Sequence, residues 1–229
     1  MKRKDKIKFK SEVAQINTEQ WFSKLNRWAE QRPWWIMGII LSVFILLAGL
    51  SFDPKPFVGG DNAAYVSLSK SLVHGNGLAE IWTPGEKPHT LYPFGFPLLL
   101  APISLFNMPY IWYKLIPWIS GLLILLVFSF LINENNKVLN ILPVFLLAVN
   151  PYFLEYSHWV LSELPFTFFS VLTFLLLHQW EKRGGYLWLS GVILSAVFAN
   201  HIRSAGIALY LGIFLYLLFK GKFKESAIF

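Results

Sequence analysis

The chain of 229 residues contains no cysteine, and only 14% of its residues are charged. The absence of cysteine excludes disulfide bonds, thiolate metal sites and cysteine nucleophiles. The sequence also lacks the glycine-rich loops that bind nucleotide phosphates, the paired histidines of zinc proteases and any internal repeat. Any active site must therefore be assembled from polar side chains that lie far apart in the sequence.

Apolar and aromatic side chains, in contrast, are abundant. Hydrophobic residues make up 55% of the sequence and aromatic residues 17%, including 10 Trp and 21 Phe. This composition is too apolar for an ordinary soluble domain and indicates a polytopic membrane protein. The many tryptophans suit the belts of aromatic residues found at membrane–water interfaces.

The formal net charge of +7 is concentrated at the two ends of the chain. Residues 1–32 carry nine Lys and Arg against four acidic residues, and residues 220–229 carry three lysines against one glutamate. Basic ends beside apolar runs follow the positive-inside rule, so we expect both termini in the cytoplasm and no nucleic-acid partner. Residues 1–33 are predicted to be a basic, amphipathic lead-in on the inner leaflet, and residues 220–229 a cytoplasmic tail.

The apolar runs predict an all-α fold, a transmembrane helix bundle of about six spans within residues 34–219. The spans are expected at Trp34–Phe52, Leu115–Ile132, Val138–Leu154, Leu164–Trp180, Tyr186–Asn200 and Ser204–Phe219. Residues 53–93, with three lysines and four acidic residues, are predicted to form an external loop that contains interfacial helices. The apolar run Phe96–Phe106 is too short to cross the bilayer and is interrupted by prolines, so it is also expected at the interface.

The external loop contains an acidic residue at the head of a predicted amphipathic helix. Asp61 follows Gly60, and Gly75-Asn76-Gly77 supplies the helix stop. An isolated aspartate before a helix is most often its N-cap. At the membrane–water boundary, however, ionisable residues often mark a functional site, and a helix N-terminus stabilises an ionised carboxylate. Asp61 is therefore a candidate both for a helix cap and for a residue of a functional site.

Other polar residues reach the same predicted surface from separate segments. Lys87, His89 and Tyr92 lie in a proline-rich part of the external loop. Glu163 opens a predicted span, and Arg203 separates two span ends. We take these five residues as candidate substrate-binding residues.

Five short segments and one arginine occur in a characteristic order: GDNAAY (60–65), GNGL (75–78), YPFGFPLL (92–99), KLIP (114–117), SELPF (162–166) and Arg203. Together they resemble bacterial C-type glycosyltransferases, relatives of the protein O-mannosyltransferases and of the lipid A aminoarabinose transferase. The resemblance covers residues 34 to about 219. It implies an inverting transfer of a sugar from a polyprenyl-phosphate donor to a hydroxyl acceptor, which is a glycan, lipid or protein, at the external face of the bacterial inner membrane.

The resemblance also implies roles for single residues. The aspartate of the first external loop is the family's catalytic base, and Asp61 stands at that place. Many members have a second acid directly after it, where this sequence has Asn62. Positive charge is needed where the phosphate leaves, and Lys87 and Arg203 are the candidates. Glu163 is expected to hydrogen-bond the external loop, to orient Asp61, or to serve only as an acid at a helix N-terminus.

No resident cofactor is predicted with certainty. A divalent cation held by His89 and His158 remains an alternative, because some relatives use one. Relatives also have more spans and usually a further external domain. We therefore expect this chain to be the amino-terminal part of a longer enzyme, or a truncated gene product, and to be inactive alone.

Two other classes of function compete with an enzyme. A transporter or flippase for a lipid-linked substrate predicts charged residues near the middle of the membrane, whereas the runs 115–132 and 138–154 contain none. A non-catalytic membrane scaffold predicts that Asp61 can be replaced without consequence.

Overall fold

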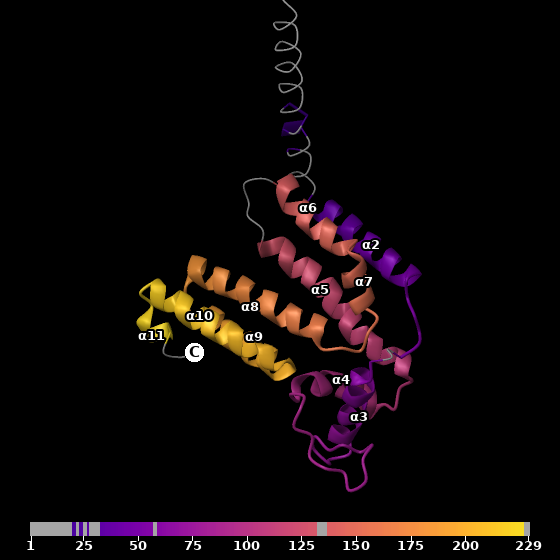
Figure 1. Cartoon of the computed structure of the whole chain (residues 1–229). Helices are drawn as coiled ribbons and strands as arrows, with labels where there is room; N and C mark the ends of the chain where they lie inside the picture. Colours follow the sequence, from indigo (N-terminus) through magenta and orange to yellow (C-terminus); the bar gives the residue numbers. More distant parts are fainter. Residues whose placement is uncertain are drawn as a thin grey trace, which may run out of the picture.

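The computed structural model describes residues 33–56, 59–131 and 137–226, together with Gln20, Trp21, Ser23, Lys24 and Arg27. Most of these residues are helical, and the described part of the chain contains no strand beyond an isolated bridge between Ala79 and Pro88. The predicted all-α fold class is confirmed (Figure 1). Most of the predicted lead-in over residues 1–33 lies outside the described residues.

The helices are, in chain order, α2 (Pro33–Leu50), α3 (Asp61–Val73), α4 (Gly95–Leu105), η1 (Tyr110–Lys114), α5 (Leu115–Leu131), α6 (Lys137–Ala148), α7 (Pro151–Tyr156), α8 (Glu163–Arg183), α9 (Tyr186–Ile202), η2 (Ser204–Gly206), α10 (Ile207–Phe219) and α11 (Phe223–Ser226). Helices α2, α5, α6 and α7 form one side of the molecule, and α8 packs between α5 and α9 (Figure 1). Helices α3 and α4 pack on each other at one end of this bundle.

The predicted span Val138–Leu154 is wrong as a single helix. The structure divides it into α6 and α7, with Asn150 between them. The Asn150 side chain accepts a hydrogen bond from the main-chain N–H of Phe153 at 3.1 Å, and Pro151 occupies the first turn of α7. Proline favours a helix start and disfavours a helical conformation in the residue before it, so the chain ends one helix and begins another here.

The number of spans stays a prediction. Within the described residues, Tyr110–Leu131 is long and apolar enough to cross a membrane. Four further apolar helices are shorter, at Trp34–Leu50, Gly95–Leu105, Tyr186–Ile202 and Ser204–Phe219. The Gly95–Leu105 helix has nearly the bounds of the short apolar run predicted at Phe96–Phe106, and its position at the interface stays a prediction.

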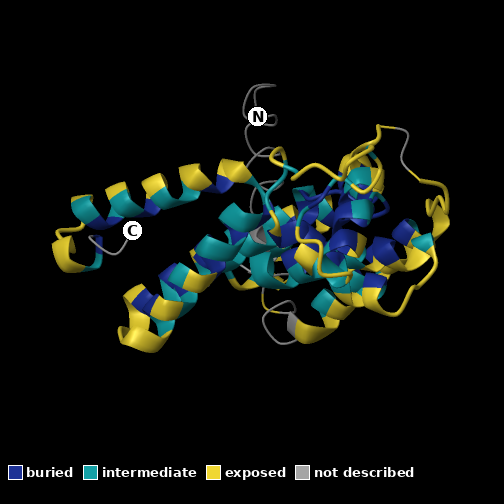
Figure 2. Ribbon diagram, turned by 90° about the horizontal axis from the view of Figure 1, so that it is seen from below, coloured by how far each residue is buried: buried dark blue, intermediate teal, exposed yellow. Residues whose placement is uncertain are grey.

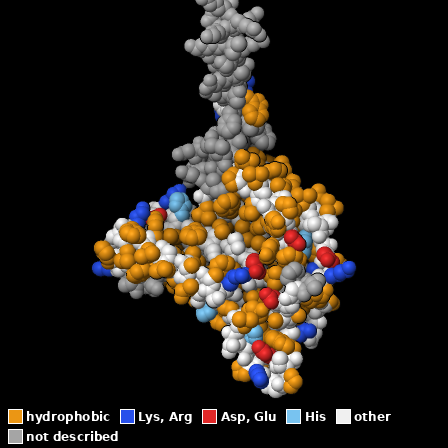
Figure 3. Space-filling view, viewed as in Figure 1, with side chains coloured by type: hydrophobic (Ala, Val, Ile, Leu, Met, Phe, Trp, Pro, Cys, Tyr) orange, Lys and Arg blue, Asp and Glu red, His pale blue; other side chains and the backbone are white. Residues whose placement is uncertain are grey.

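The surface is as apolar as the composition indicates. Large apolar side chains stand exposed on several helices, including Leu50, Leu187 and Phe219, which are 77%, 82% and 88% exposed. Buried residues concentrate where the helices meet, whereas the outer helix faces are exposed (Figure 2). Hydrophobic side chains cover most of the face in Figure 3, with charged side chains in small groups. Such extensive apolar surface suits contact with lipid.

A buried cluster beneath α3 and α4 fixes these two helices to the bundle. Its core contains Tyr65, Val66, Phe96, Leu100, Tyr113, Val160, Leu161 and Ile202. Side-chain hydrogen bonds cross the same region. The Ser104 hydroxyl lies 2.6 Å from the Ser69 hydroxyl and 2.9 Å from the Tyr113 hydroxyl. The side-chain amide of Asn62 donates to the Tyr110 hydroxyl at 2.8 Å. These contacts set the orientation of α3, and with it the position of Asp61.

Candidate functional site

A pocket of about 230 Å³ opens where α3, the end of the external loop, the α7–α8 connection and the α9–α10 connection meet. It is lined by Asp61, Tyr65, Leu91, Tyr92, Pro93, Leu161, Ser162, Glu163, Ile202, Arg203 and Ser204. Four of the six residues predicted from the sequence thus come together, although they lie in four separate segments: Asp61, Tyr92, Glu163 and Arg203.

Asp61 is not the N-cap that its position predicts. Gly60 occupies the cap position with φ of +86°, and its main-chain oxygen accepts from the N–H groups of Ala63 and Ala64. Asp61 is the first helical residue, and no side chain caps this helix. Glycine adopts a positive φ without the steric cost that a side chain brings, which explains why the helix begins one residue earlier than predicted. The Asp61 carboxylate therefore lines the pocket without serving as a cap.

Tyr92 holds this carboxylate. Its hydroxyl donates to Oδ1 of Asp61 at 2.8 Å. Burial, followed by this hydrogen bond, raises the pKa of Tyr92 to about 12. The phenol therefore stays protonated at neutral pH and remains a donor. Within the described chain, Oδ2 of Asp61 makes no hydrogen bond, which leaves this oxygen for a proton-donating group in the pocket.

Arg203 and Glu163 form an ion pair across the pocket lining. Nη1 of Arg203 lies 2.6 Å from Oε1 of Glu163, and both side chains are partly exposed, at 42% and 35%. The hydrogen bond to Glu163 raises the pKa of Arg203 further above its ordinary value. Glu163 is the first residue of α8, and its partner is Arg203 rather than Asp61. Its other oxygen, Oε2, is buried without a partner among the described residues.

Tyr65 belongs to the pocket lining but is absent from the residues predicted from the sequence. Its hydroxyl lies 3.2 Å from that of Ser162, and its ring packs against Tyr92 with centroids 4.7 Å apart. Burial raises the pKa of Tyr65. Its spacing of four residues from Asp61 places both on one face of α3, and this spacing is the signal that could have identified it.

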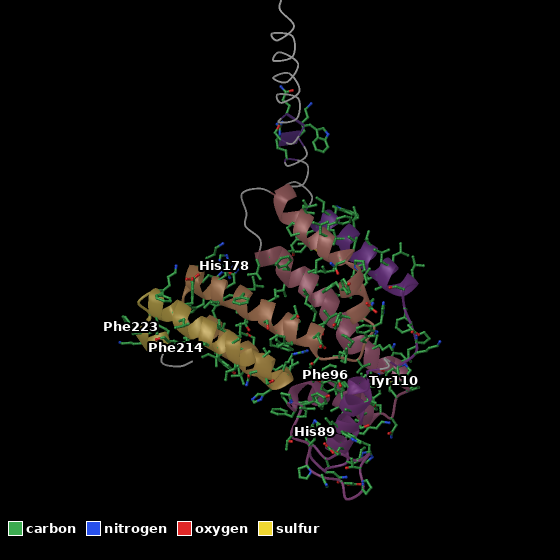
Figure 4. All side chains as sticks on the ribbon, viewed as in Figure 1. His89, Phe96, Tyr110, His178, Phe214 and Phe223 are labelled. Carbon is green, nitrogen blue, oxygen red and sulfur yellow. The ribbon has the colours of Figure 1, made fainter. Side chains whose placement is uncertain are left out.

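His89 does not line the pocket. Figure 4 shows it in the loop beside α3 and α4, well apart from His178. Its side chain is 4% exposed, Nδ1 lies 3.0 Å from Oε1 of Glu80, and Nε2 accepts from the main-chain N–H of Tyr92 at 2.9 Å. Both ring nitrogens are engaged, so in this arrangement neither is available to a substrate or a metal ion.

Lys87 is exposed in the same loop and is not among the pocket-lining residues. Its main-chain oxygen accepts from the N–H of Glu80 at 2.8 Å, which closes the loop across residues 80–87. Its predicted role as a phosphate ligand stays a prediction.

No group of three or more His, Asp or Glu side chains close enough to hold a metal ion occurs among the described residues. His158 is 3% exposed, and its Nε2 lies 3.0 Å from the Ser51 hydroxyl. Burial, and then the nearby charge of Lys114, lowers the pKa of His158. His89 and His158 thus have different partners, and a divalent cation shared between them stays an untested prediction.

Lys114, from the KLIP segment, ties the start of the external loop to the bundle. It is 2% exposed, and its ammonium donates to the main-chain oxygens of Asp53 and of Lys55, the latter at 2.7 Å. The Phe52 ring lies 5.4 Å from Nζ. These contacts satisfy the buried charge and anchor the loop on which Asp61 stands.

Two apolar grooves also occur. One of about 520 Å³ lies between α2 and the η1–α5 segment and includes Phe52, Lys114 and Trp118 in its lining. The other, of about 490 Å³, lies between α4, α8 and α9 and is lined almost entirely by hydrophobic residues. Both offer surfaces suited to hydrocarbon chains.

A comparison with protein-family profiles matches residues 92–223 to the dolichyl-phosphate-mannose-protein mannosyltransferases. No curated protein and no solved structure matches the chain. The match includes Tyr92, Glu163 and Arg203 and begins after Asp61. Because it covers more than half of the 229 residues, the chain belongs to the dolichyl-phosphate-mannose-protein mannosyltransferase family, a family of membrane glycosyltransferases that use polyprenyl-phosphate sugars.

Proposed function

We propose that the pocket is the catalytic centre of an inverting glycosyltransferase, with Asp61 as the general base. The donor is a polyprenyl-phosphate sugar, and the acceptor is a hydroxyl of a glycan, lipid or protein at the external face of the bacterial inner membrane. The general reaction follows from family membership, whereas the acceptor, the membrane face and the residue roles are proposals. The observation that supports them best is the Asp61 carboxylate, which faces the pocket and does not cap its helix.

In this proposal, Oδ2 of Asp61 takes the proton of the acceptor hydroxyl as the acceptor oxygen attacks the anomeric carbon. The new carbon–oxygen bond forms as the bond from the anomeric carbon to the phosphate oxygen breaks. The electron pair of the broken bond leaves with the phosphate, and the configuration at the anomeric carbon inverts. Tyr92 keeps Asp61 oriented through its hydrogen bond to Oδ1.

Arg203 is proposed to stabilise the phosphate as its negative charge develops. One guanidinium nitrogen is paired with Glu163, and the side chain is 42% exposed, so other N–H groups remain available for phosphate oxygens. The polyprenyl tail requires an apolar surface, which the two grooves offer. This type of donor explains why a transferase can work without a glycine-rich nucleotide loop.

Replacing Asp61 by Asn separates catalysis from structure. The amide oxygen of the new side chain can still accept from Tyr92, and no helix cap is lost. We expect an unchanged melting temperature and a fall in kcat of roughly 100-fold or more, because the amide cannot take a proton. The measurement uses the natural gene product in nanodiscs, with labelled polyprenyl-phosphate mannose as the donor.

Asp53→Asn is the matched control. Asp53 lies in the same loop, and its carboxylate accepts from the main-chain N–H of Lys55 at 2.9 Å, outside the pocket. This variant should keep its kcat. A fully active Asp61→Asn variant would falsify the assignment of Asp61 as the base.

A further inference from the structure

In the external loop, His89 packs against Tyr92, the residue that donates a hydrogen bond to Asp61. The loop folds back on itself through two main-chain hydrogen bonds, from His89 to Leu78 at 2.7 Å and from Glu80 to Lys87 at 2.8 Å. This pairing sets Glu80 beside His89, where their side chains meet at 3.0 Å. The His89 ring also packs against the Tyr92 ring with centroids 5.0 Å apart and planes at 31°.

The two hydrogen bonds of His89 define which nitrogen carries the proton. A main-chain N–H can only donate, so Nε2, which contacts the N–H of Tyr92 at 2.9 Å, must be the unprotonated nitrogen. Nδ1 must then carry the proton and donate it to Glu80. The arrangement therefore requires a neutral imidazole, because a proton on Nε2 would face the Tyr92 N–H and break this contact.

Several contacts restrain Tyr92. His89 lies against one part of its ring, Tyr65 packs 4.7 Å from its centroid, and its N–H is held by Nε2. Its hydroxyl is thereby directed at Oδ1 of Asp61. Hydrogen bonds thus join Glu80 to His89 and His89 to the main chain of Tyr92, and the Tyr92 side chain in turn contacts the carboxylate.

We propose that Glu80 and neutral His89 are positioning residues that hold the Tyr92 hydroxyl on Asp61 and so keep the base in its reactive orientation. The inference rests on the proposed function of Asp61. It assigns His89 to the support of the base and not to the donor or a metal ion, because its side chain is 4% exposed and both nitrogens are used. Glu80, which no pattern in the sequence marks, fixes the tautomer of His89.

Two substitutions of His89 separate positioning from other roles. In His89→Gln, the amide oxygen can accept from the Tyr92 N–H while the amide nitrogen donates to Glu80, as the neutral imidazole does. His89→Leu fills similar space and makes neither hydrogen bond. With polyprenyl-phosphate mannose as the donor, we expect kcat of the natural gene product to fall by about 10- to 100-fold for Leu, since small misplacements of a catalytic group are costly. The Gln variant should stay close to the parent.

A double substitution tests the route through Tyr92. If His89 acts only by directing the Tyr92 hydroxyl, His89→Leu should cause no further loss of kcat in a Tyr92→Phe background. Additive losses would overturn the inference. Melting temperatures measured alongside identify any variant that has simply lost its fold.

The tautomer can be observed without any activity. The chain has 5 histidines, and ¹⁵N-histidine NMR of the parent in nanodiscs, compared with His89→Gln, identifies the resonances of His89. We expect one protonated and one bare ring nitrogen at neutral pH, with the proton on Nδ1. A doubly protonated ring would overturn the inference. An inactive Asp61→Asn variant beside a fully active His89→Leu variant would reject the positioning role alone, whereas an active Asp61→Asn variant would reject the proposed function itself.

Discussion

At the scale of single residues, Arg203 is the one cation among the residues that line the pocket. Its pair with Glu163 fixes the guanidinium, and its partial exposure leaves it accessible to a ligand. If Arg203 holds the donor phosphate, Arg203→Gln should weaken donor use by about 1.5–3 kcal/mol, the range of a charge-assisted hydrogen bond. This corresponds to a rise of roughly 10- to 150-fold in the donor KM, or an equivalent loss in kcat/KM, measured with labelled polyprenyl-phosphate mannose.

Lys87→Gln is the comparison for this experiment. It removes the other cation predicted from the sequence, which is exposed in the loop and lies outside the pocket lining. Because Lys87 lies outside the pocket lining, we expect Lys87→Gln to weaken donor use less than Arg203→Gln does. Equal losses from the two variants would instead mean that both cations hold the phosphate, and unchanged kinetics in both would remove both from the site.

At the scale of secondary-structure elements, the start of α4 lies directly against the end of α9. A Cβ added at Gly95 would come within 2.5 Å of the carbonyl carbon and oxygen of His201 and 2.8 Å of the main-chain nitrogen of Ile202. Gly206 makes a similar approach, because its added Cβ would lie 2.4 Å from Cα of Asn200. These two glycines let the segment that carries Arg203 pack closely between α4, α9 and η2.

Gly95→Ala should therefore force α4 away from α9. We expect a loss of stability of about 1–3 kcal/mol, the usual range for overpacking, together with reduced donor use because Arg203 is displaced. Thermal and denaturant unfolding in nanodiscs measure the first effect. Gly212→Ala in α10 is the matched control, because its added Cβ meets nothing within 4 Å, and it should leave both properties nearly unchanged. Equal behaviour of the two variants would contradict this view of the α4–α9 contact.

At the scale of the whole molecule, the predicted topology places the external loop and the basic ends of the chain on opposite sides of the membrane. His89 in the loop and His178 near the end of α8 lie well apart in the structure (Figure 4). The chain contains no cysteine, so single cysteines can report on this arrangement. In intact cells, an impermeant thiol reagent should label Lys87→Cys in the loop and spare Lys182→Cys at the end of α8. Labelling of Lys182→Cys without labelling of Lys87→Cys would show that the chain has the opposite orientation in the membrane.

Much of the helix pattern could be predicted because it depends on local properties. The starts of α5 at Leu115 and of α9 at Tyr186 agree with the predicted starts, since apolar runs bounded by polar residues define helices of this kind. The division at Asn150-Pro151 also depends on local residues, because the asparagine caps α7 and the proline lies in its first turn. The apolar run continues across these residues, so apolar character alone does not locate the division. The cap of α3 is Gly60 and not the predicted Asp61, because both residues are acceptable caps and the backbone conformation decides between them.

The sequence by itself determined the membrane class, the all-α fold and a set of candidate polar residues, because composition and periodicity record which surfaces must avoid water. Only the tertiary structure decided which candidates meet. It joined Asp61 to Tyr92 and Glu163 to Arg203, left Lys87 outside the pocket, and placed His89 behind Tyr92. These contacts join residues that are distant in the sequence or depend on how a loop folds back. They follow from the packing of whole helices, such as α4 against α9, which no local pattern encodes.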